Sequence, residues 1–199
     1  MSDPLRVHGF ETSNNMKVRV ALGYKGLPYE FLEVDPKDRT TIHGLTGQHF
    51  TPVLEHGDRR IFDSAAILRY LDANFLDTPR LFGSDYHEQR AIESWEGFAR
   101  TELAAPMMEV VLTRVRGEEV SDETLTRCGA EFAEAGSELV ERLKGHDWLV
   151  GDDLTAADVT AAPVIFRVRE GKVLPWDGSL DALAAWVDRV MGHDGKGRL

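Results

Sequence analysis

The feature that most limits the fold of this chain is a change in its secondary-structure signals near residue 85. Strand and helix patterns alternate before this point, and only helical patterns follow it. The segment 77–85, which contains a proline and a glycine, has the composition of a linker. We therefore predict an α/β domain over residues 1–76 and an all-helical domain over residues 86–199.

The first domain is expected to follow the order β-α-β-α-β-β-α. Alternating apolar residues indicate the strands, and polar caps beside an apolar stripe indicate the helices. The expected elements are strands at 5–10 and 29–35, a hairpin within 51–62, and helices that end at Gly26, lie around 39–45 and span 63–75. So many short elements in one segment describe a compact α/β unit.

The second domain is expected to contain helices alone. Helical periodicity runs through the segments 85–115, 121–145, 155–170 and 179–192. Within them, Pro106 and Pro163 lack the backbone N–H that a helix interior uses. Each proline is therefore expected to kink or break its helix.

Composition indicates a folded protein with a net negative charge. Hydrophobic residues make up 42 % of the 199 residues, which is enough for a core. The formal net charge is −11 and Lys and Arg do not cluster. This argues against nucleic acid or an anionic membrane as a partner, because phosphate groups are bound by local positive charge. We find no transmembrane-length apolar run and no secretory signal, so we expect a cytoplasmic protein.

Cysteine and histidine usage predicts neither a redox pair nor a metal site. Cys128 is the only cysteine, which excludes an intrachain disulfide and a CxxC motif, and it is expected to be a small core residue. The seven histidines form no H-E-x-x-H pattern, so we expect no metal.

Small polar residues at 12–15 stand between the first strand and the first helix, and one of them would suffice as a cap. A helix N-terminus carries N–H donors and partial positive charge, and a hydroxyl on Thr12 or Ser13 adds a donor. Such a site suits an anion such as a thiolate, although capping alone explains the same residues. Lowering a thiol pKa by about two units takes roughly 2.7 kcal/mol, which one hydroxyl hydrogen bond and a helix terminus can supply.

A second helix start, at Asp63 and Ser64, has the same character, and on spacing alone plain N-capping is the favoured interpretation. Upstream, Thr51 precedes Pro52 at the start of the predicted hairpin. If the peptide bond between them is cis, the backbone of Thr51 faces outward and can pair with an extended peptide.

Three long segments carry a resemblance to a known family. They are HGFETSNNMKVRVALGYKGLPYEFLEVD, TGQHFTPVLEHGDRRIFDSAAILRYLDANF and WLVGDDLTAADVTAAPVIFRV. With the order of the domains, they resemble the glutathione transferase superfamily over essentially the whole chain. The resemblance implies a thioredoxin-like α/β N-terminal domain (βαβαββα) and an all-α C-terminal domain. In the third segment, Thr155 and Asp158 are expected to form a capping box.

The resemblance implies that glutathione binds to the first domain as a co-substrate. The implied contacts are Thr51, before a cis Pro52, for the cysteinyl backbone, Asp63 and Ser64 for the γ-glutamyl end, and Gln48 or His49 from the preceding loop, with Lys37 more remote.

The resemblance also implies a hydroxyl that stabilises the glutathione thiolate. Thr12 falls where the serine-type members carry their catalytic serine, Ser13 is an equal candidate, and Asn14 is the third. The tyrosine type is excluded because no tyrosine precedes Tyr24, and the cysteine type because Cys128 lies far from this segment.

The implied second substrate is a small hydrophobic electrophile. Phe10, Met107, Met108 and Val111 are expected to line its pocket, although packing explains the residues of the helical segment equally well. The implied protein is a homodimer that conjugates or reduces electrophiles, as in detoxification. Two alternatives stay open: a zeta-type glutathione-dependent isomerase, and a non-catalytic module for binding or dimerisation.

Overall fold

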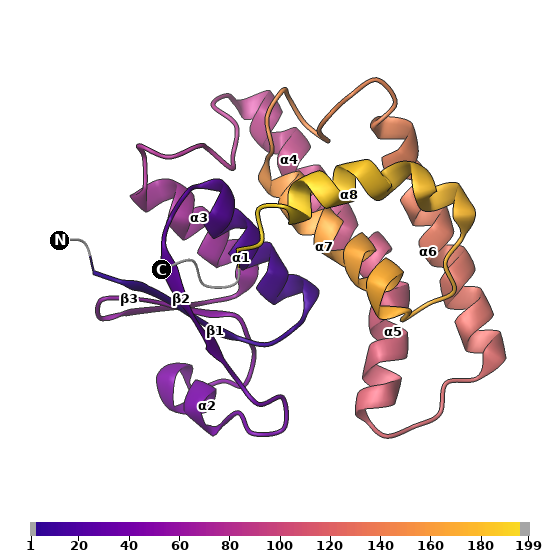
Figure 1. The fold of residues 1–199 in the computed structure, drawn as a ribbon, viewed down its shortest axis with the longest axis horizontal. Coiled ribbons are helices and arrows are strands. Elements are labelled where there is room, and N and C mark those ends of the chain that lie inside the picture. The colour runs from indigo at the N-terminus through magenta and orange to yellow at the C-terminus, as the bar shows by residue number, and fades with distance from the viewer. Residues whose placement is uncertain (1–2, 196–199) are drawn as a thin grey trace. The chain divides into compact units, whose positions relative to one another are not determined.

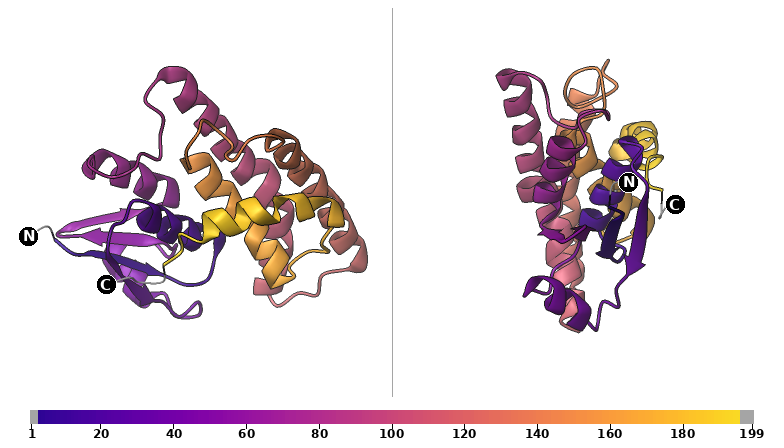
Figure 2. Two further views of the ribbon diagram at one scale, coloured as in Figure 1. Left: turned by 45° about the horizontal axis from the view of Figure 1, so that its top comes forward. Right: turned by 90° about the vertical axis from the view of Figure 1, so that its left-hand side faces the viewer.

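The computed structural model describes residues 3–195 of the chain. This part divides into two compact units (Figures 1 and 2). Residues 3–82 and 192–195 form the first unit, and residues 83–191 form the second. The predicted linker, 77–85, spans the boundary in sequence between them. The end of the described chain therefore belongs to the same unit as its beginning.

A four-stranded mixed sheet forms the centre of the first unit. Its strands are β1 (Leu5–Gly9), β2 (Tyr29–Glu33), β3 (Val53–His56) and β4 (Arg59–Phe62), in the order β2-β1-β3-β4. β1 runs parallel to β2 and antiparallel to β3, and β3 and β4 form an antiparallel hairpin. Parallel neighbours need a crossover connection, which the helix α1 (Ser13–Tyr24) supplies.

Helices cover both faces of this sheet. α1 and α3 (Ser64–Asn74) pack together on one face, and α2 (Thr40–Thr46) lies on the other (Figure 1). Ile42 of α2 is fully buried in a cluster with Val34 and Val53. The element order is the βαβαββα order of the predicted thioredoxin-like domain, so this prediction is confirmed.

α1 is buried on nearly every side, whereas its sequence suggested a helix with one polar face. The buried stretch covers residues 13–22 with one exception and includes Lys17 and Arg19. Glu11 and Asp194 ion-pair with Arg19, at 3.0 Å and 2.7 Å. Burial alone would lower the pKa of Arg19. The hydrogen bonds and negative charges of Asp194 and Glu11 outweigh this effect, so the pKa of Arg19 is raised. Ion pairing therefore lets a charged residue occupy an inward position.

The segment 192–195 lies against the first unit. Oη of Tyr29, in β2, donates a hydrogen bond to the carbonyl oxygen of Gly195 at 2.5 Å. Gly23, in α1, leaves room for the segment, because a Cβ at this position would lie 1.9 Å from the carbonyl oxygen of His193. This tail is thus part of the N-terminal fold although it follows the helical unit in sequence.

The second unit, described over its whole length, consists of helices and contains no strand. Its elements are α4 (Tyr86–Phe98), the π-helical turn η1 (Ala99–Leu103), α5 (Ala104–Val115), α6 (Asp122–Arg142), α7 (Ala156–Gly171), the 3-10 helix η2 (Gly178–Leu183) and α8 (Ala184–Met191). α7 is the central helix, since residues on all of its sides are buried. Among the described residues of either unit, we find no helix with the length and apolar character needed to cross a membrane.

Local features of the second unit agree with the sequence in one case and differ in another. The capping box of α7 is present, and Oδ2 of Asp158 accepts the backbone N–H of Thr155 at 3.0 Å. α7 continues through Pro163 to its end, so this proline does not break the helix. Burial of the surrounding turns holds the helix together despite the missing hydrogen bond. Pro106 is the third residue of α5, which follows the π-helical turn, and α5 continues past it to Val115, so this proline does not break its helix either.

Candidate functional site

The start of α1 presents a hydroxyl whose acceptor capacity is fully used. Thr12 is the N-cap, and its Oγ1 accepts the backbone N–H of Asn15 at 3.3 Å. The side-chain Nδ2 of Asn15 donates to the same oxygen at 2.7 Å. Thr12 is half-buried, whereas Ser13 is buried and Asn14 is exposed. Of the three predicted candidates, Thr12 therefore has a half-accessible hydroxyl that is left to act as a donor.

Asn15 joins this helix start to the segment before β3. Its Nδ2 also donates to Oγ1 of Thr51, at 3.1 Å, and the Thr51–Pro52 peptide bond is cis, as the resemblance implied. We did not single out Asn15 from the sequence. The available signal was one more polar residue in the first helical turn than capping needs.

The start of α3 is linked to the start of α1. Asp63 is the N-cap of α3, with φ 70°, and its Oδ1 accepts the backbone N–H groups of Ala65 at 2.8 Å and Ala66 at 3.2 Å. The hydroxyl of Ser64 donates to Oδ1 of Asn14 at 3.3 Å. Two helix N-termini, each with partial positive charge, thus meet through one side-chain contact.

Gln48 folds the loop before β3 onto itself. Its Nε2 donates to Oγ1 of Thr46 at 2.8 Å and to the carbonyl oxygen of Phe50 at 3.0 Å. Its Oε1 accepts the backbone N–H of Phe50. These contacts give Gln48 a role in shaping the loop that carries Thr51.

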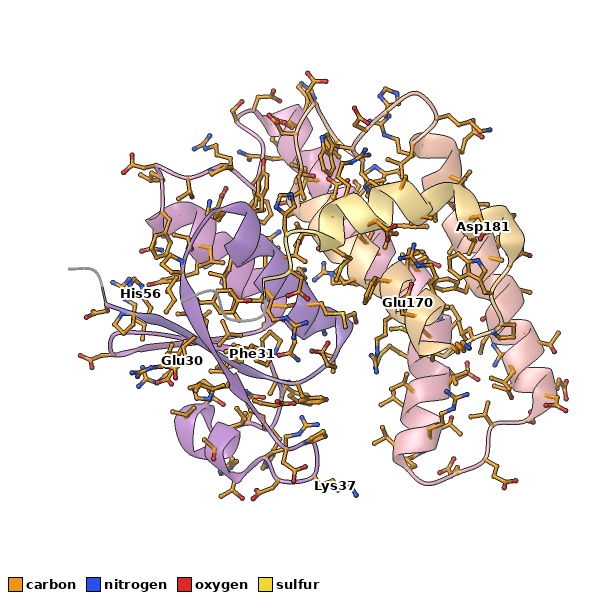
Figure 3. The ribbon with its side chains drawn as sticks, viewed as in Figure 1. Glu30, Phe31, Lys37, His56, Glu170 and Asp181 are labelled. Atoms are coloured by element: carbon orange, nitrogen blue, oxygen red, sulfur yellow. The ribbon has the colours of Figure 1, made fainter. Side chains whose placement is uncertain are left out.

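Arg39 and His49 form the other side of this loop. The ring of His49 stacks on that of His43, with centroids 4.7 Å apart. The carbonyl oxygen of His49 accepts a hydrogen bond from Nη1 of Arg39 at 2.9 Å. The guanidinium of Arg39 lies 4.5 Å from the ring centroid of Phe10. Arg39 was missed from the sequence because its partners are distant along the chain. Lys37, labelled in Figure 3, is exposed on the loop that follows β2.

The residues predicted for the electrophile lie in both units. Phe10 follows β1 and is half-buried, Met107 is fully buried in α5, and Met108 and Val111 are half-buried on the same helix. Their contact with an electrophile stays a prediction.

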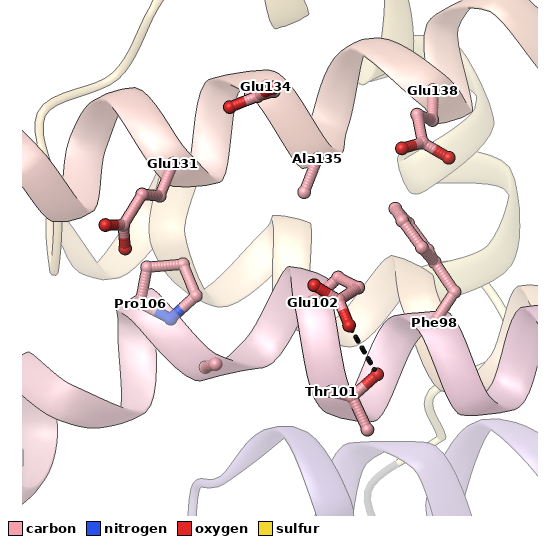
Figure 4. Close-up of a pocket in the computed structure, with 9 residues that line it drawn as sticks. Phe98, Thr101, Glu102, Pro106, Glu131, Glu134, Ala135 and Glu138 are labelled. Carbon is pink, nitrogen blue, oxygen red and sulfur yellow. Dashed lines mark hydrogen bonds between the residues drawn. The ribbon is translucent and has the colours of Figure 1, made fainter.

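A cavity of about 350 Å³ opens in the second unit between α6 and the helical segment from α4 to α5 (Figure 4). It is lined by Phe98, Thr101, Glu102, Ala105, Pro106, Glu131, Glu134, Ala135 and Glu138. Four carboxylates face this space, so it is a poor site for an anion such as glutathione.

Cys128 is fully buried in α6, and burial is the main cause that raises the pKa of its thiol. It behaves as the core residue that its sequence context suggested. Among residues 3–195 we find no group of three or more side chains with metal-ligand chemistry in reach of one ion.

Comparison with known families decides the classification of the chain. The family model for the glutathione S-transferase N-terminal domain matches residues 7–79, and that for the C-terminal domain matches residues 122–189. The chain belongs to the glutathione transferase superfamily. The superfamily and the two-part fold inferred from the sequence are therefore confirmed.

Individual transferases extend this result. Glutathione S-transferase U7 of Arabidopsis thaliana is 30 % identical over 186 residues, which cover 89 % of this chain and 78 % of that protein. Glutathione S-transferase 1 of Dianthus caryophyllus is 31 % identical over 177 residues, covering 81 % and 76 %. A solved glutathione S-transferase of Methylobacterium radiotolerans, in complex with glutathione sulfonate, has a TM-score of 0.78 and 26 % identity and covers 94 % of this chain and 90 % of its own.

Proposed function

We propose that this chain is a glutathione transferase in which the hydroxyl of Thr12 donates a hydrogen bond to the thiolate of bound glutathione. One observation carries the proposal: Oγ1 of Thr12 accepts hydrogen bonds from both the backbone N–H and the Nδ2 of Asn15. A hydroxyl has two acceptor lone pairs and one O–H. With both lone pairs engaged, the O–H is left to donate, which is the contact that a thiolate needs.

The donors and acceptors of the first unit fit glutathione. The carboxylate of Asp63 suits the ammonium of the γ-glutamyl group. The hydroxyl of Ser64, at the start of α3, suits its carboxylate once it exchanges its hydrogen bond to Asn14 for one to the ligand. The backbone of Thr51 suits an extended peptide such as the cysteinyl unit. The Methylobacterium radiotolerans structure holds glutathione sulfonate, and its likeness to this chain supports the same class of ligand.

The energies are sufficient for thiol activation. A hydrogen bond to a charged group contributes about 1.5–3 kcal/mol, and a helix N-terminus adds about 0.3–1 kcal/mol. Lowering the thiol pKa by two units from about 8.5 takes roughly 2.7 kcal/mol. Thr12 and the start of α1 would therefore keep the thiol largely ionised at neutral pH, its proton having passed to solvent.

The thiolate then attacks an electrophilic carbon. The new sulfur–carbon bond forms as the bond to the leaving group breaks, and the leaving group departs with the electron pair. The contribution of this chain is to bind glutathione, orient its sulfur and stabilise its charge. We further propose small hydrophobic electrophiles as second substrates and a cytoplasmic homodimer as the working form, to be tested by the mass in sedimentation.

The decisive assay combines retention on immobilised glutathione with conjugation of a chlorodinitrobenzene substrate. Thr12→Ala should keep glutathione binding and lower kcat/KM by about 25-fold at pH 7, because a two-unit rise in the thiol pKa cuts the ionised fraction from roughly three quarters to about 3 %, and by about 100-fold on the acidic side. Thr113→Ala removes the same hydroxyl from the second unit and should match the wild type. If Ser13→Ala shows the loss and Thr12→Ala does not, the role belongs to Ser13.

The same measurements separate the two alternatives. A wild-type protein that binds glutathione without turning over any electrophile would be a binding module. Glutathione-dependent isomerisation of maleylacetoacetate, in the absence of conjugation, would identify a zeta-type isomerase.

A further inference from the structure

We propose that Asn15 is a positioning residue that directs the hydroxyl of Thr12 toward the glutathione sulfur. The inference rests on the proposed function and deepens it, because it names the residue on which the donor depends. Asn15 is fully buried and acts through Thr12.

The side chain of Asn15 does more than helix capping requires. Capping is already provided by the bond from the backbone N–H of Asn15 to Oγ1 of Thr12. The bond from Nδ2, at 2.7 Å, is additional and is the shorter of the two. It occupies the second lone pair of the hydroxyl, so the O–H can turn only away from Asn15.

The same amide also holds the segment that precedes β3. Nδ2 of Asn15 also donates to Oγ1 of Thr51, at 3.1 Å. Thr51 is the residue proposed to pair with the cysteinyl backbone of glutathione. One buried amide thus sets the spacing between the thiolate donor and the peptide that carries the thiol.

The orientation of this amide is kept although it leaves an acceptor unpaired. Oδ1 of Asn15 is buried and has no hydrogen-bond partner among the described residues. Such a buried, unpaired oxygen is unfavourable, and native proteins retain few of them. Turned the other way, the amide would offer Oδ1 to the hydroxyls of Thr12 and Thr51 and would draw their hydrogens away from a ligand.

Gly9, at the end of β1, leaves space for the unpaired Oδ1 of Asn15. A Cβ on Gly9, the last residue of β1, would lie 1.8 Å from Oδ1 of Asn15 and 2.6 Å from its Cγ. Only a glycine therefore leaves space for Asn15 in its present position. Gly9 and Asn15 form a matched pair on which the geometry of Thr12 depends.

The test compares Asn15→Leu and Asn15→Asp with the wild type. Leucine keeps the branched shape and removes the donor, whereas aspartate keeps the size and shape and replaces the donor with an acceptor. We measure the thiol pKa of bound glutathione by titrating the ultraviolet absorbance of the thiolate, together with the pH profile of kcat/KM.

In Asn15→Leu, the thiol pKa should rise by about one unit, which lowers kcat/KM about tenfold on the acidic side. The activity at high pH should approach that of the wild type, because the thiol is then ionised without help. In Asn15→Asp, the pKa should rise at least as far. Asn74→Leu makes the same chemical change at the far end of α3 and should leave the profile unchanged.

Three results would overturn the inference. The first is an equal loss of activity at every pH without a displaced thiol pKa, which a purely structural role predicts. The second is an unchanged pKa in folded Asn15→Leu. The third is wild-type behaviour in Asn15→Asp, which would mean that the amide faces the hydroxyls with its oxygen. A wild-type protein that binds no glutathione, or does not lower its thiol pKa, would instead remove the proposed function.

Discussion

The carboxylate of Asp194 binds the buried guanidinium of Arg19 through two parallel hydrogen bonds. Nε of Arg19 lies 2.8 Å from Oδ1, and Nη2 lies 2.7 Å from Oδ2. The side chain of Arg19 is 1 % exposed and that of Asp194 is 12 % exposed. Glu11, the residue before Thr12, binds the same guanidinium from another side. The segment 192–195 thereby supports the helix whose start carries the proposed thiolate donor.

Loss of this pair should destabilise the protein strongly. Asp194→Ala leaves Arg19 with Glu11 as its partner, and a buried charge that loses a partner costs about 3 kcal/mol. For a chain of this length, we expect a Tm lower by roughly 6–12 °C. The control Asp188→Ala removes an ion pair with Arg169 in which the side chain of Asp188 is 64 % exposed. That change should cost less than about 1 kcal/mol, and equal shifts in thermal unfolding would contradict the role of Asp194.

Substitution of Gly23 should release the C-terminal tail. The Cβ of Gly23→Ala would lie 1.9 Å from a backbone oxygen of His193, and a backbone atom cannot yield as a flexible side chain can. We expect the backbone N–H groups of residues 192–195 to exchange faster with solvent, as measured by hydrogen exchange, and stability to fall by about 1–3 kcal/mol. Gly97 in α4 has no atom near its missing Cβ, so Gly97→Ala should stabilise the protein by about 0.4–1 kcal/mol. A tail that remains protected in Gly23→Ala would argue against tight docking.

Gly9→Ala tests the amide of Asn15 without changing it. The new methyl group would occupy the position of Oδ1, so the amide must leave the hydroxyl of Thr12. We expect the thiol pKa of bound glutathione to rise and the neutral-pH activity to fall. Gly44→Ala in α2, where the added methyl group meets no atom, is the matched control and should keep both values. Titration of the bound thiol reads the difference, and equal thiol pKa values in the two variants would refute the coupling.

The order of elements could be predicted because its signals are local. The residues that form a helix cap lie within one helical turn, as Asp63 does at the start of α3 and as Thr155 and Asp158 do in their capping box. The hydrophobic periodicity of an element likewise depends only on the residues of that element. These features place the two helix N-termini of the site correctly without reference to the rest of the chain.

The remaining features depend on partners that are distant in sequence. Asn15 donates a hydrogen bond to Thr51, and Arg39 lies over the ring of Phe10. No local sequence pattern predicts either contact. The burial of α1 was mistaken for the same reason, because a charged residue counts as polar in a periodicity analysis. Arg19 is tolerated inside the fold only by contacts that the folded chain brings to it.

Asp158 should give the second unit a distinctive pH dependence. It is fully buried, and its Oδ1 accepts the backbone N–H of Leu149 at 2.9 Å and Nε1 of Trp186 at 3.0 Å. Burial raises the pKa of Asp158 above its usual value, and the hydrogen bonds oppose this shift only in part. Asp158→Asn replaces one carboxylate oxygen, which accepts a hydrogen bond, with an NH₂ group that can only donate. We expect the free energy of unfolding to fall by about 2–4 kcal/mol at neutral pH.

The sign of the pH effect follows from the raised pKa of Asp158. The unfolded chain releases this proton at a lower pH than the folded chain does, so stability from this group falls as the pH rises through the interval between the two values. Asp85, the exposed N-cap of α4, has the opposite sign, because backbone hydrogen bonds from Glu88 and His87 lower its pKa. Its contribution is lost as the pH falls. Urea unfolding across the acid range should therefore give Asp158→Asn and Asp85→Asn difference curves of opposite slope. A flat curve for Asp158→Asn, or one parallel to that of Asp85→Asn, would contradict a raised pKa of Asp158.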